Sequence, residues 1–313
     1  MPCMKSKLLF GVLRSAVVVA CIVVAFSVSQ SCSDKPNDDS DPVDTMPSWR
    51  QYELDVNAAW SPDGSKIIYF RFPPSLGRDT AWQWGVFIHD ISTAKDTCLW
   101  PNFRFLYCCW SPDGNKIAYT DAEAQVFVHD FIEGSSRRLT YGHRFHSPRW
   151  SPCGDKLAFV ERTNDGGLFL WDFEADSLIH INSRAEADAA DWMADCSTLV
   201  MHDSTIYPSV HDSSVIVKYN IYTDSLSVIA KLAGYKYEIR ISPDQQTIIF
   251  GIRNNLWGIS INGGEPYQLT TEGGGFPDFS PDGQWIVYTR INPWYAYLWL
   301  MRPDGSEKHQ ITF

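Results

Sequence analysis

The stretch Trp110-Ser111-Pro112-Asp113-Gly114, followed by Lys116-Ile117-Ala118-Tyr119, decides the fold of this chain. Proline presets φ at the first turn position, Asp suits the second, and Gly takes the left-handed geometry that closes a hairpin. The apolar run that follows places hydrophobic side chains on both faces of a strand, because successive residues point to opposite faces. The stretch therefore predicts a strand, a tight turn and a second strand that is covered on both sides.

Six copies of this stretch share one register. Their spacings are 50, 40, 42, 49 and 38 residues, and their leading residues are Trp60, Trp110, Trp150, Trp192, Ile241 and Phe279. Self-similarity of this period predicts units that cannot cover their own apolar faces and pack against one another. Cys196 and Gln245 occupy the Gly position in the fourth and fifth copies, where we expect a strained or altered turn.

Each unit continues with a third strand, such as 125–129, and a fourth, such as 137–140. The sequence therefore predicts an all-β fold, a six-bladed β-propeller with four antiparallel strands per blade, over residues 48–313. The sixth unit supplies its own fourth strand. Residues 48–52 are expected to lie along that blade, with an added outer strand as the alternative.

The Trp-Ser-Pro-Asp-Gly, Lys-Ile-Ala-Tyr and Arg138-Leu139-Thr140 pieces resemble the propeller repeats of TolB and of its relatives with WD-like repeats. The resemblance covers the whole expected propeller and implies a fold rather than a role. TolB carries an additional α/β domain before its propeller, where this chain has a short acidic stretch. The docking role of TolB at the Tol–Pal system is therefore not implied.

The first 31 residues have the features of an export signal. Three basic residues precede a neutral apolar run at 15–28, which is too short to span a bilayer comfortably. Ser29 and Ser31 before Cys32 resemble a bacterial lipoprotein signal, so we expect Cys32 to be lipidated. Because Ser29 stands where Leu is usual, secretion without a lipid is the alternative. Cleavage before Cys21 is rejected, since it would leave residues 22–28 as an exposed apolar stretch.

Residues 32–47 are acidic and broken by proline, which predicts a flexible tether. Some surface-exported lipoproteins have similar tethers, but a solvated spacer is the simpler interpretation. Loss of residues 1–31 removes three basic and no acidic residues and changes the net charge from −11 to −14. Nucleic acid is therefore not expected as a partner.

The remaining cysteines have no metal-binding or disulfide-framework spacing. Most are expected to be small buried hydrophobic residues. Cys153 and Cys196 occupy equivalent turns, but nothing in the sequence brings their Cα atoms within disulfide reach.

The search for catalytic motifs finds no nucleophile elbow, P-loop, His-Glu-x-x-His pair or calcium loop. His143 and His146 lie in the connection that leads into the third blade, where the central channel is expected to open. Some sugar-acid lyases with related propellers use histidines around a metal there. Two histidines alone are more typical of loop hydrogen bonding, so we expect no metal and no cofactor.

Charged residues alternate in sign just before four of the leading residues: Arg149, Asp191, Arg240 and Asp278. Inner strands surround the channel, so we expect these side chains to pair between neighbouring blades, with ligand binding as the alternative.

Aromatic residues and histidines are expected to gather on the face that carries the longer loops. The set is Trp82, Phe105, His143, Phe145, His146, Tyr207, His211, Tyr235, Trp294 and Tyr295. Such clusters mark binding sites for protein or sugar, but they also cap the edges of blades.

Three functions are compatible with these features. The first is a module of the bacterial cell envelope, periplasmic or at the cell surface, that binds a protein or peptide on its loop face or at the channel mouth. The second is a lyase or hydrolase acting on carbohydrate, with His143 and His146 at its centre. The third is a structural or sensory subunit of an envelope complex. We favour the first and expect no catalytic residues.

Overall fold

The structure, a computed structural model, describes residues 54–72, 84–161, 167–182, 190–203, 213–233, 236–292 and 295–313. The chain divides into two compact units, residues 1–50 and 51–313, and every described residue belongs to the second. These residues form strands, turns and irregular connections, without a helix. Accordingly, the described part has no helix of the length and apolarity needed to cross a membrane. The expected all-β class is confirmed for this part.

Twenty-four strands of the described part follow one another in groups of four, which we call quartets one to six. Quartet one contains β1 (Leu54–Trp60), β2 (Lys66–Phe72), β3 (Gly85–Asp90) and β4 (Lys95–Pro101). Quartet two contains β5 (Phe105–Trp110), β6 (Lys116–Asp121), β7 (Val126–Asp130) and β8 (Ser135–Arg138). Quartet three contains β9 (Phe145–Trp150), β10 (Lys156–Glu161), β11 (Gly167–Asp172) and β12 (Ser177–Asn182).

Quartet four contains β13 (Ala190–Trp192), β14 (Thr198–Asp203), β15 (Ser213–Asn220) and β16 (Ser225–Ala233). Quartet five contains β17 (Lys236–Ile241), β18 (Thr247–Ile252), β19 (Asn255–Ser260) and β20 (Tyr267–Gln268). Quartet six contains β21 (Gly275–Phe279), β22 (Ile286–Asn292), β23 (Tyr295–Met301) and β24 (His309–Gln310).

Consecutive strands within a quartet pair antiparallel, and quartets two to five each form a separate four-stranded sheet. Quartets six and one belong to one eight-stranded sheet, because Leu54 of β1 pairs in parallel with Ala296 of β23. The expectation of six separate sheets therefore differs from what is observed. Four sheets have four strands, and the other two expected sheets are merged by this pairing.

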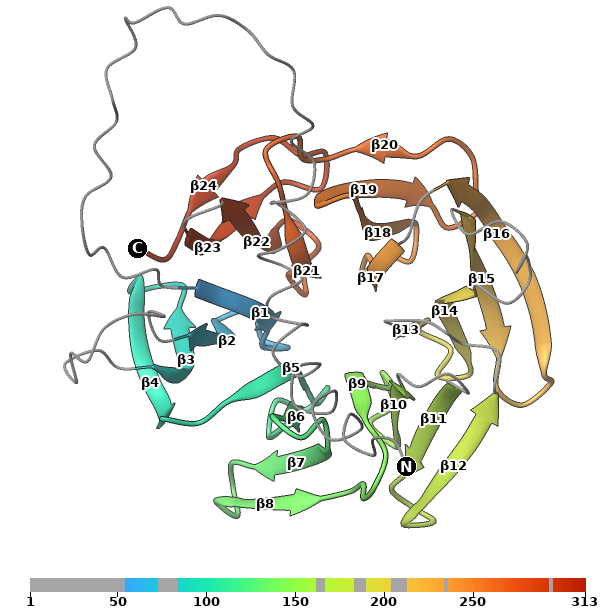
Figure 1. Ribbon diagram of the computed structural model, residues 1–313, viewed down its shortest axis with the longest axis horizontal. Coiled ribbons are helices and arrows are strands. Elements are labelled where there is room, and N and C mark those ends of the chain that lie inside the picture. Colours follow the sequence, from blue (N-terminus) through green and yellow to red (C-terminus); the bar gives the residue numbers. More distant parts are fainter. Residues whose placement is uncertain are drawn as a thin grey trace, which may run out of the picture. The chain divides into compact units, whose positions relative to one another are not determined.

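The first strands of the quartets lie innermost and the fourth strands outermost (Figure 1). The innermost strands contact one another in turn, from β1 through β5, β9, β13, β17 and β21 back to β1. Quartets one and six therefore meet, which gives a closed, propeller-like arrangement. β24 pairs with β23, so quartet six has its own fourth strand. The expected position of residues 48–52 lies outside the described residues.

The core lies between the quartets rather than within them. In β6, Ile117 and Ala118 are fully buried and Tyr119 is 4% exposed, as expected for a strand covered on both faces. One hydrophobic cluster combines Leu170 of quartet three with Leu199 of quartet four, and each of the other described clusters also spans neighbouring quartets. Burial of apolar surface between sheets therefore stabilises the ring as a whole.

The Ser-Pro-Asp-Gly turns connect the first and second strands, as predicted. In the first copy, the Ser61 hydroxyl donates to Asp63 Oδ1 at 2.6 Å and accepts from the Lys66 amide at 2.9 Å. Gly64 adopts φ +70°, the left-handed geometry expected there. The same serine bonds recur at Ser111 and Ser280.

Neighbouring turns pack against one another around the ring. In four turns the glycine lies against the proline of the preceding quartet, and these pairs are Gly64 with Pro281, Gly114 with Pro62, Gly154 with Pro112, and Gly283 with Pro243. The turns of neighbouring quartets are therefore adjacent, and the requirement for glycine at this position comes from its positive φ.

The fourth turn, which has neither Pro nor Gly, is joined to its neighbours by other bonds. Cys196 forms a disulfide with Cys153 of quartet three, with the Cα atoms 6.0 Å apart. On the other side, the Ala194 amide donates to Gln245 Oε1 of quartet five at 3.0 Å. Cys196 and Gln245 both adopt positive φ, of 55° and 62°.

The expectation that Cys153 and Cys196 lie out of disulfide reach is therefore wrong. The turns of neighbouring quartets lie side by side, and the spacing of the repeats in the sequence does not reveal how short the distance between them is. Cys108 and Cys109 are free and buried, as expected for small hydrophobic residues.

Candidate functional site

The connection between β8 and β9 and the loop between β6 and β7 lie at the same end of the sheets. The Phe145 amide donates to the Ala124 carbonyl at 2.8 Å, and Gln125 Nε2 donates to the His143 carbonyl. We call this end, with residues 122–125 and 139–144, the loop face. The other end is the turn face, where the Phe131 amide donates to the Asn115 carbonyl at 2.9 Å.

His143 is held on the loop face by a buried carboxylate. Its Nδ1 lies 2.6 Å from Glu161 Oε1, at the end of β10. The His143 side chain is 63% exposed, whereas that of Glu161 is only 9% exposed. A carboxylate on one ring nitrogen fixes the orientation of the imidazole, so Nε2 is left for the solvent side.

Beside His143, the connection exposes the ring of Tyr141 and the guanidinium group of Arg144, and the half-buried Arg138 lies next to it at the end of β8. Tyr141 is 71% exposed, and the Arg138 guanidinium lies over its ring, 4.4 Å from the centroid. Arg138 Nε also donates to the Thr140 carbonyl at 2.7 Å. Arg144 is exposed and, within the described part, makes no hydrogen bond or ion pair.

Phe105 and Phe145 do not belong to this surface, contrary to expectation. Both are fully buried, in hydrophobic clusters between quartets one and two and between two and three. They occupy the same position at the start of β5 and β9, where the side chain points between sheets. His146 is only 7% exposed and meets the ring of Tyr107 edge-on at 5.7 Å.

Tyr295 is 40% exposed at the start of β23 and stacks on Tyr297 at 5.1 Å between ring centroids. The remaining expected site residues lie outside the described residues: Trp82, Tyr207, His211, Tyr235 and Trp294, together with the lipidation site Cys32.

The four alternating charges connect innermost strands, but they do not form two ion pairs. Arg240 Nε lies 3.2 Å from Asp278 Oδ1 of the next quartet. Asp191 instead accepts the Ile241 amide of the next quartet at 2.8 Å. Arg149 donates to the carbonyls of Cys108, at 3.3 Å, and Pro148, at 2.8 Å.

Both aspartates thus accept a main-chain amide from the neighbouring innermost strand, since Asp278 Oδ2 accepts the Trp60 amide at 2.9 Å. Among the described residues Asp191 has no ion pair, because the chain places an amide rather than a guanidinium at its carboxylate.

Comparison with known proteins places this arrangement among solved propellers. No family model matches the chain. TolB from Acinetobacter baumannii superposes with a TM-score of 0.62 at 18% identity, over 82% of this chain and 62% of that chain. A putative TolB from Agrobacterium tumefaciens gives 0.61 at 17% identity, over 71% of this chain and 85% of that chain. The fold is that of a TolB-type β-propeller.

Oligogalacturonate lyase from Vibrio parahaemolyticus shares the TolB-type arrangement less closely, with a TM-score of 0.53 at 11% identity, over 80% of this chain and 90% of that chain. Among curated proteins, the uncharacterized protein Atu1656 of Agrobacterium fabrum is 34% identical over 77 residues. That match covers 23% of this chain and 26% of the relative. At these identities the solved structures establish the fold alone.

Burial changes the titration of the two inner-strand aspartates of this TolB-type propeller. It raises the pKa of Asp191 and that of Asp278 to about 6, and the positive charge of Arg149 opposes the rise in both. These carboxylates therefore change charge closer to neutral pH than ordinary aspartates do.

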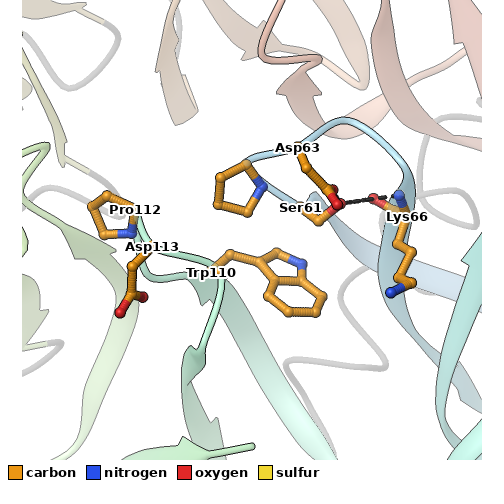
Figure 2. A pocket seen from close by; sticks show the side chains of 8 residues that line it. Ser61, Asp63, Lys66, Trp110, Pro112 and Asp113 are labelled. Carbon is orange, nitrogen blue, oxygen red and sulfur yellow. Dashed lines mark hydrogen bonds between the residues drawn. The ribbon is translucent and has the colours of Figure 1, made fainter.

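A cavity of about 370 Å³ lies on the turn face between the turns of quartets one and two. Figure 2 shows Trp110 and Pro112 of one turn facing Ser61, Asp63 and Lys66 of the other. The indole N–H of Trp110 donates to the Ala59 carbonyl at 3.3 Å, and Ser61 bonds within its own turn. The polar groups of Trp110 and Ser61 that line the cavity are thus engaged in bonds within the turn or between the two quartets.

Within the described ranges, no three His, Cys, Asp or Glu side chains are grouped to hold a metal ion. The sequence reasoning missed Arg138, Tyr141, Arg144 and Glu161. Three of them, Arg138, Tyr141 and Arg144, lie in a segment whose composition could have pointed to them. Residues 134–154 contain four Arg and two His but no Asp or Glu.

Proposed function

We propose that this chain is a cell-envelope binding module, a TolB-like propeller that holds a protein or peptide partner on its loop face. Each quartet is one blade, which makes six. The shared eight-stranded sheet is then a local merging of two blades, since Leu54 and Ala296 are the one pair of described residues that joins β1 to β23. The unbroken circle of contacts between innermost strands supports this count.

The observation that carries the proposal is the exposure of four consecutive residues, 141–144. The connection that contains them is fixed by hydrogen bonds from neighbouring strands and loops. Gln125 holds its backbone at His143, and Glu161 holds the His143 ring. Exposed aromatic and basic side chains on a rigid support are typical of binding surfaces. The inner-strand charges, by contrast, are engaged in contacts between quartets.

An envelope location is supported by the Cys153–Cys196 disulfide, because disulfides persist in oxidising compartments and are rare in the cytosol. A signal peptide at residues 1–31, lipidation of Cys32 and a tether at 32–47 complete the proposal. In this arrangement the propeller is lipid-anchored, on the periplasmic side or at the cell surface.

Site-specific photocrosslinking in the native envelope tests the proposal. A photoreactive residue replaces Tyr141 on the loop face or, as the matched control, Ile132 on the turn face of the same quartet. Both positions are well exposed, at 71% and 77%. We expect a discrete protein adduct from position 141 and none from position 132. Equal adducts from both positions, or none from either, would contradict the proposal.

A carbohydrate-active lyase or hydrolase is the second candidate. The observation that favours it is the oriented imidazole of His143, since a carboxylate-held histidine is the usual form of a general base. Incubation of the protein with polyuronates, followed by assay of new reducing ends, tests this function. Activity that His143→Ala abolishes would establish it over the binding module.

A further inference from the structure

A basic segment lies within a chain that is otherwise strongly acidic. Residues 134–154 carry Arg137, Arg138, Arg144, Arg149, His143 and His146 without one Asp or Glu, whereas the whole chain has a net charge of −11. Opposite charge in one segment concentrates a positive potential at the surface where that segment is exposed.

Two of its arginines are already engaged. Arg137 pairs with Asp176 at 2.6 Å, on the outer side of the ring, and Arg149 is 8% exposed and bonds main-chain carbonyls. Arg138 and Arg144 have no carboxylate partner within the described part. The arginines whose charge is not paired with a carboxylate in the described part are therefore Arg144, which is exposed, and Arg138, which is half-buried and whose guanidinium lies over the Tyr141 ring.

The acidic groups nearest to this surface are few. Glu161 is buried and bound to His143, and Asp121 accepts the amides of Glu123 and Gln125. The Glu123 carboxylate is exposed on the loop between β6 and β7. Among the described residues 122–125 and 139–144 of the loop face, Glu123 is therefore the one acid beside Arg144 and His143, and this described part of the surface is basic.

The shape of the surface indicates the size of its ligand. Tyr141 is 71% exposed and the His143 side chain 63% exposed, so both project from the loop face. Small molecules are usually bound in concave sites that bury most of their surface. Projecting Tyr and Arg side chains are instead typical of the residues that dominate contacts between proteins.

We propose that Arg138, Tyr141, His143 and Arg144 form a docking surface for an acidic segment of a protein partner. Carboxylates of the segment pair with the two guanidinium groups, and an apolar side chain packs on the Tyr141 ring. The inference rests on the proposed binding function and adds the chemistry of the partner.

Binding of synthetic peptides to the full-length chain tests this inference. The probe is a fluorescent peptide of Glu and Ser with one Leu, and its matched control has Gln for every Glu. Anisotropy is measured at low and at physiological ionic strength. We expect the Glu peptide to bind, the Gln peptide not to bind, and added salt to weaken the complex.

Charge reversal locates the site. Arg138→Glu with Arg144→Glu is expected to weaken binding by about tenfold or more, because it replaces attraction by repulsion. Arg253→Glu is the control, since Arg253 is exposed between β18 and β19 at the end of quartet five that corresponds to the loop face. It should leave affinity unchanged. Unfolding midpoints equal to that of the wild type exclude loss of fold.

Three results would overturn the inference: equal affinity for the Gln peptide, equal affinity of the double variant, or tight binding of oligouronates that excludes the Glu peptide. The crosslinking experiment separates this failure from that of the proposed function. A protein captured from position 141 whose capture survives the double reversal supports the binding function and refutes the acidic docking. Absence of capture from position 141 contradicts the binding function and, with it, the docking of a partner, even where the peptide binds as expected.

Discussion

Cys153 and Cys196 join the turns of quartets three and four by a disulfide at the one junction where the later turn has neither proline nor glycine. In the corresponding position of other turns, glycine packs against the proline of the preceding quartet. The disulfide thus joins covalently two turns that correspond to turns which, at four other junctions, are joined by packing of glycine on proline.

Removal of this bond is expected to destabilise the propeller. The disulfide closes a separation of 43 residues, and a bond of this kind contributes about 2–4 kcal/mol to the free energy of unfolding. Cys153→Ser with Cys196→Ser should therefore lower the thermal midpoint. Reductant should lower the midpoint of the wild type and leave that of the double variant unchanged. A wild type that is insensitive to reductant would contradict the prediction.

The indole of Trp192 is expected to stabilise the junction between quartets three and four. Its Nε1 donates to the Arg149 carbonyl at 3.0 Å, so Trp192→Phe removes a hydrogen bond worth about 1 kcal/mol in addition to lost packing. Trp150→Phe is the control, because Trp150 Nε1 has no partner in the described part. Denaturant unfolding should show the larger loss for Trp192, and equal losses would refute this role.

Phe105 is expected to act on stability rather than on binding. Phe105→Ala should reduce the free energy of unfolding by about 3–5 kcal/mol, because a fully buried ring leaves a cavity. Tyr141→Ala, on an exposed ring, should change it by less than about 0.5 kcal/mol. Urea unfolding measures both. A small loss of stability in Phe105→Ala would indicate that this side chain is exposed, as expected from the sequence.

The two inner-strand aspartates are expected to make stability fall as the pH rises. Their pKa is about 6 in the fold against 3.8 as the ordinary value, so the native state holds these protons more tightly than the unfolded state. The stability they contribute is fully present below about pH 4 and is lost as the pH rises through about 6.

Thermal midpoints between pH 4 and 7 measure this effect. Asp191→Asn should flatten the decline, because the residue no longer titrates. Asp90→Asn is the control, since hydrogen bonds from Ser92 and Thr93 hold the pKa of Asp90 at about 2, below this window. An unchanged slope in Asp191→Asn would show that Asp191 titrates normally.

The repeated elements were predictable from sequence because turn chemistry and the run of apolar residues are local properties. Contacts between quartets were not. The Cys153–Cys196 bond depends on how close the turns lie around the ring, and the Glu161–His143 contact depends on the register that pairs Glu161 with Phe145. Phe105 and Phe145 were expected on the face that carries the longer loops, yet both begin innermost strands and are fully buried.

The pairing of Leu54 with Ala296 has a consequence for biogenesis. The first strand gains its last neighbour only when residues close to the end of the chain are in place, because pairings between residues far apart in sequence form after the local ones. Until then, the apolar side chains of β1 that finally pack against β23 are exposed to water and can cause aggregation.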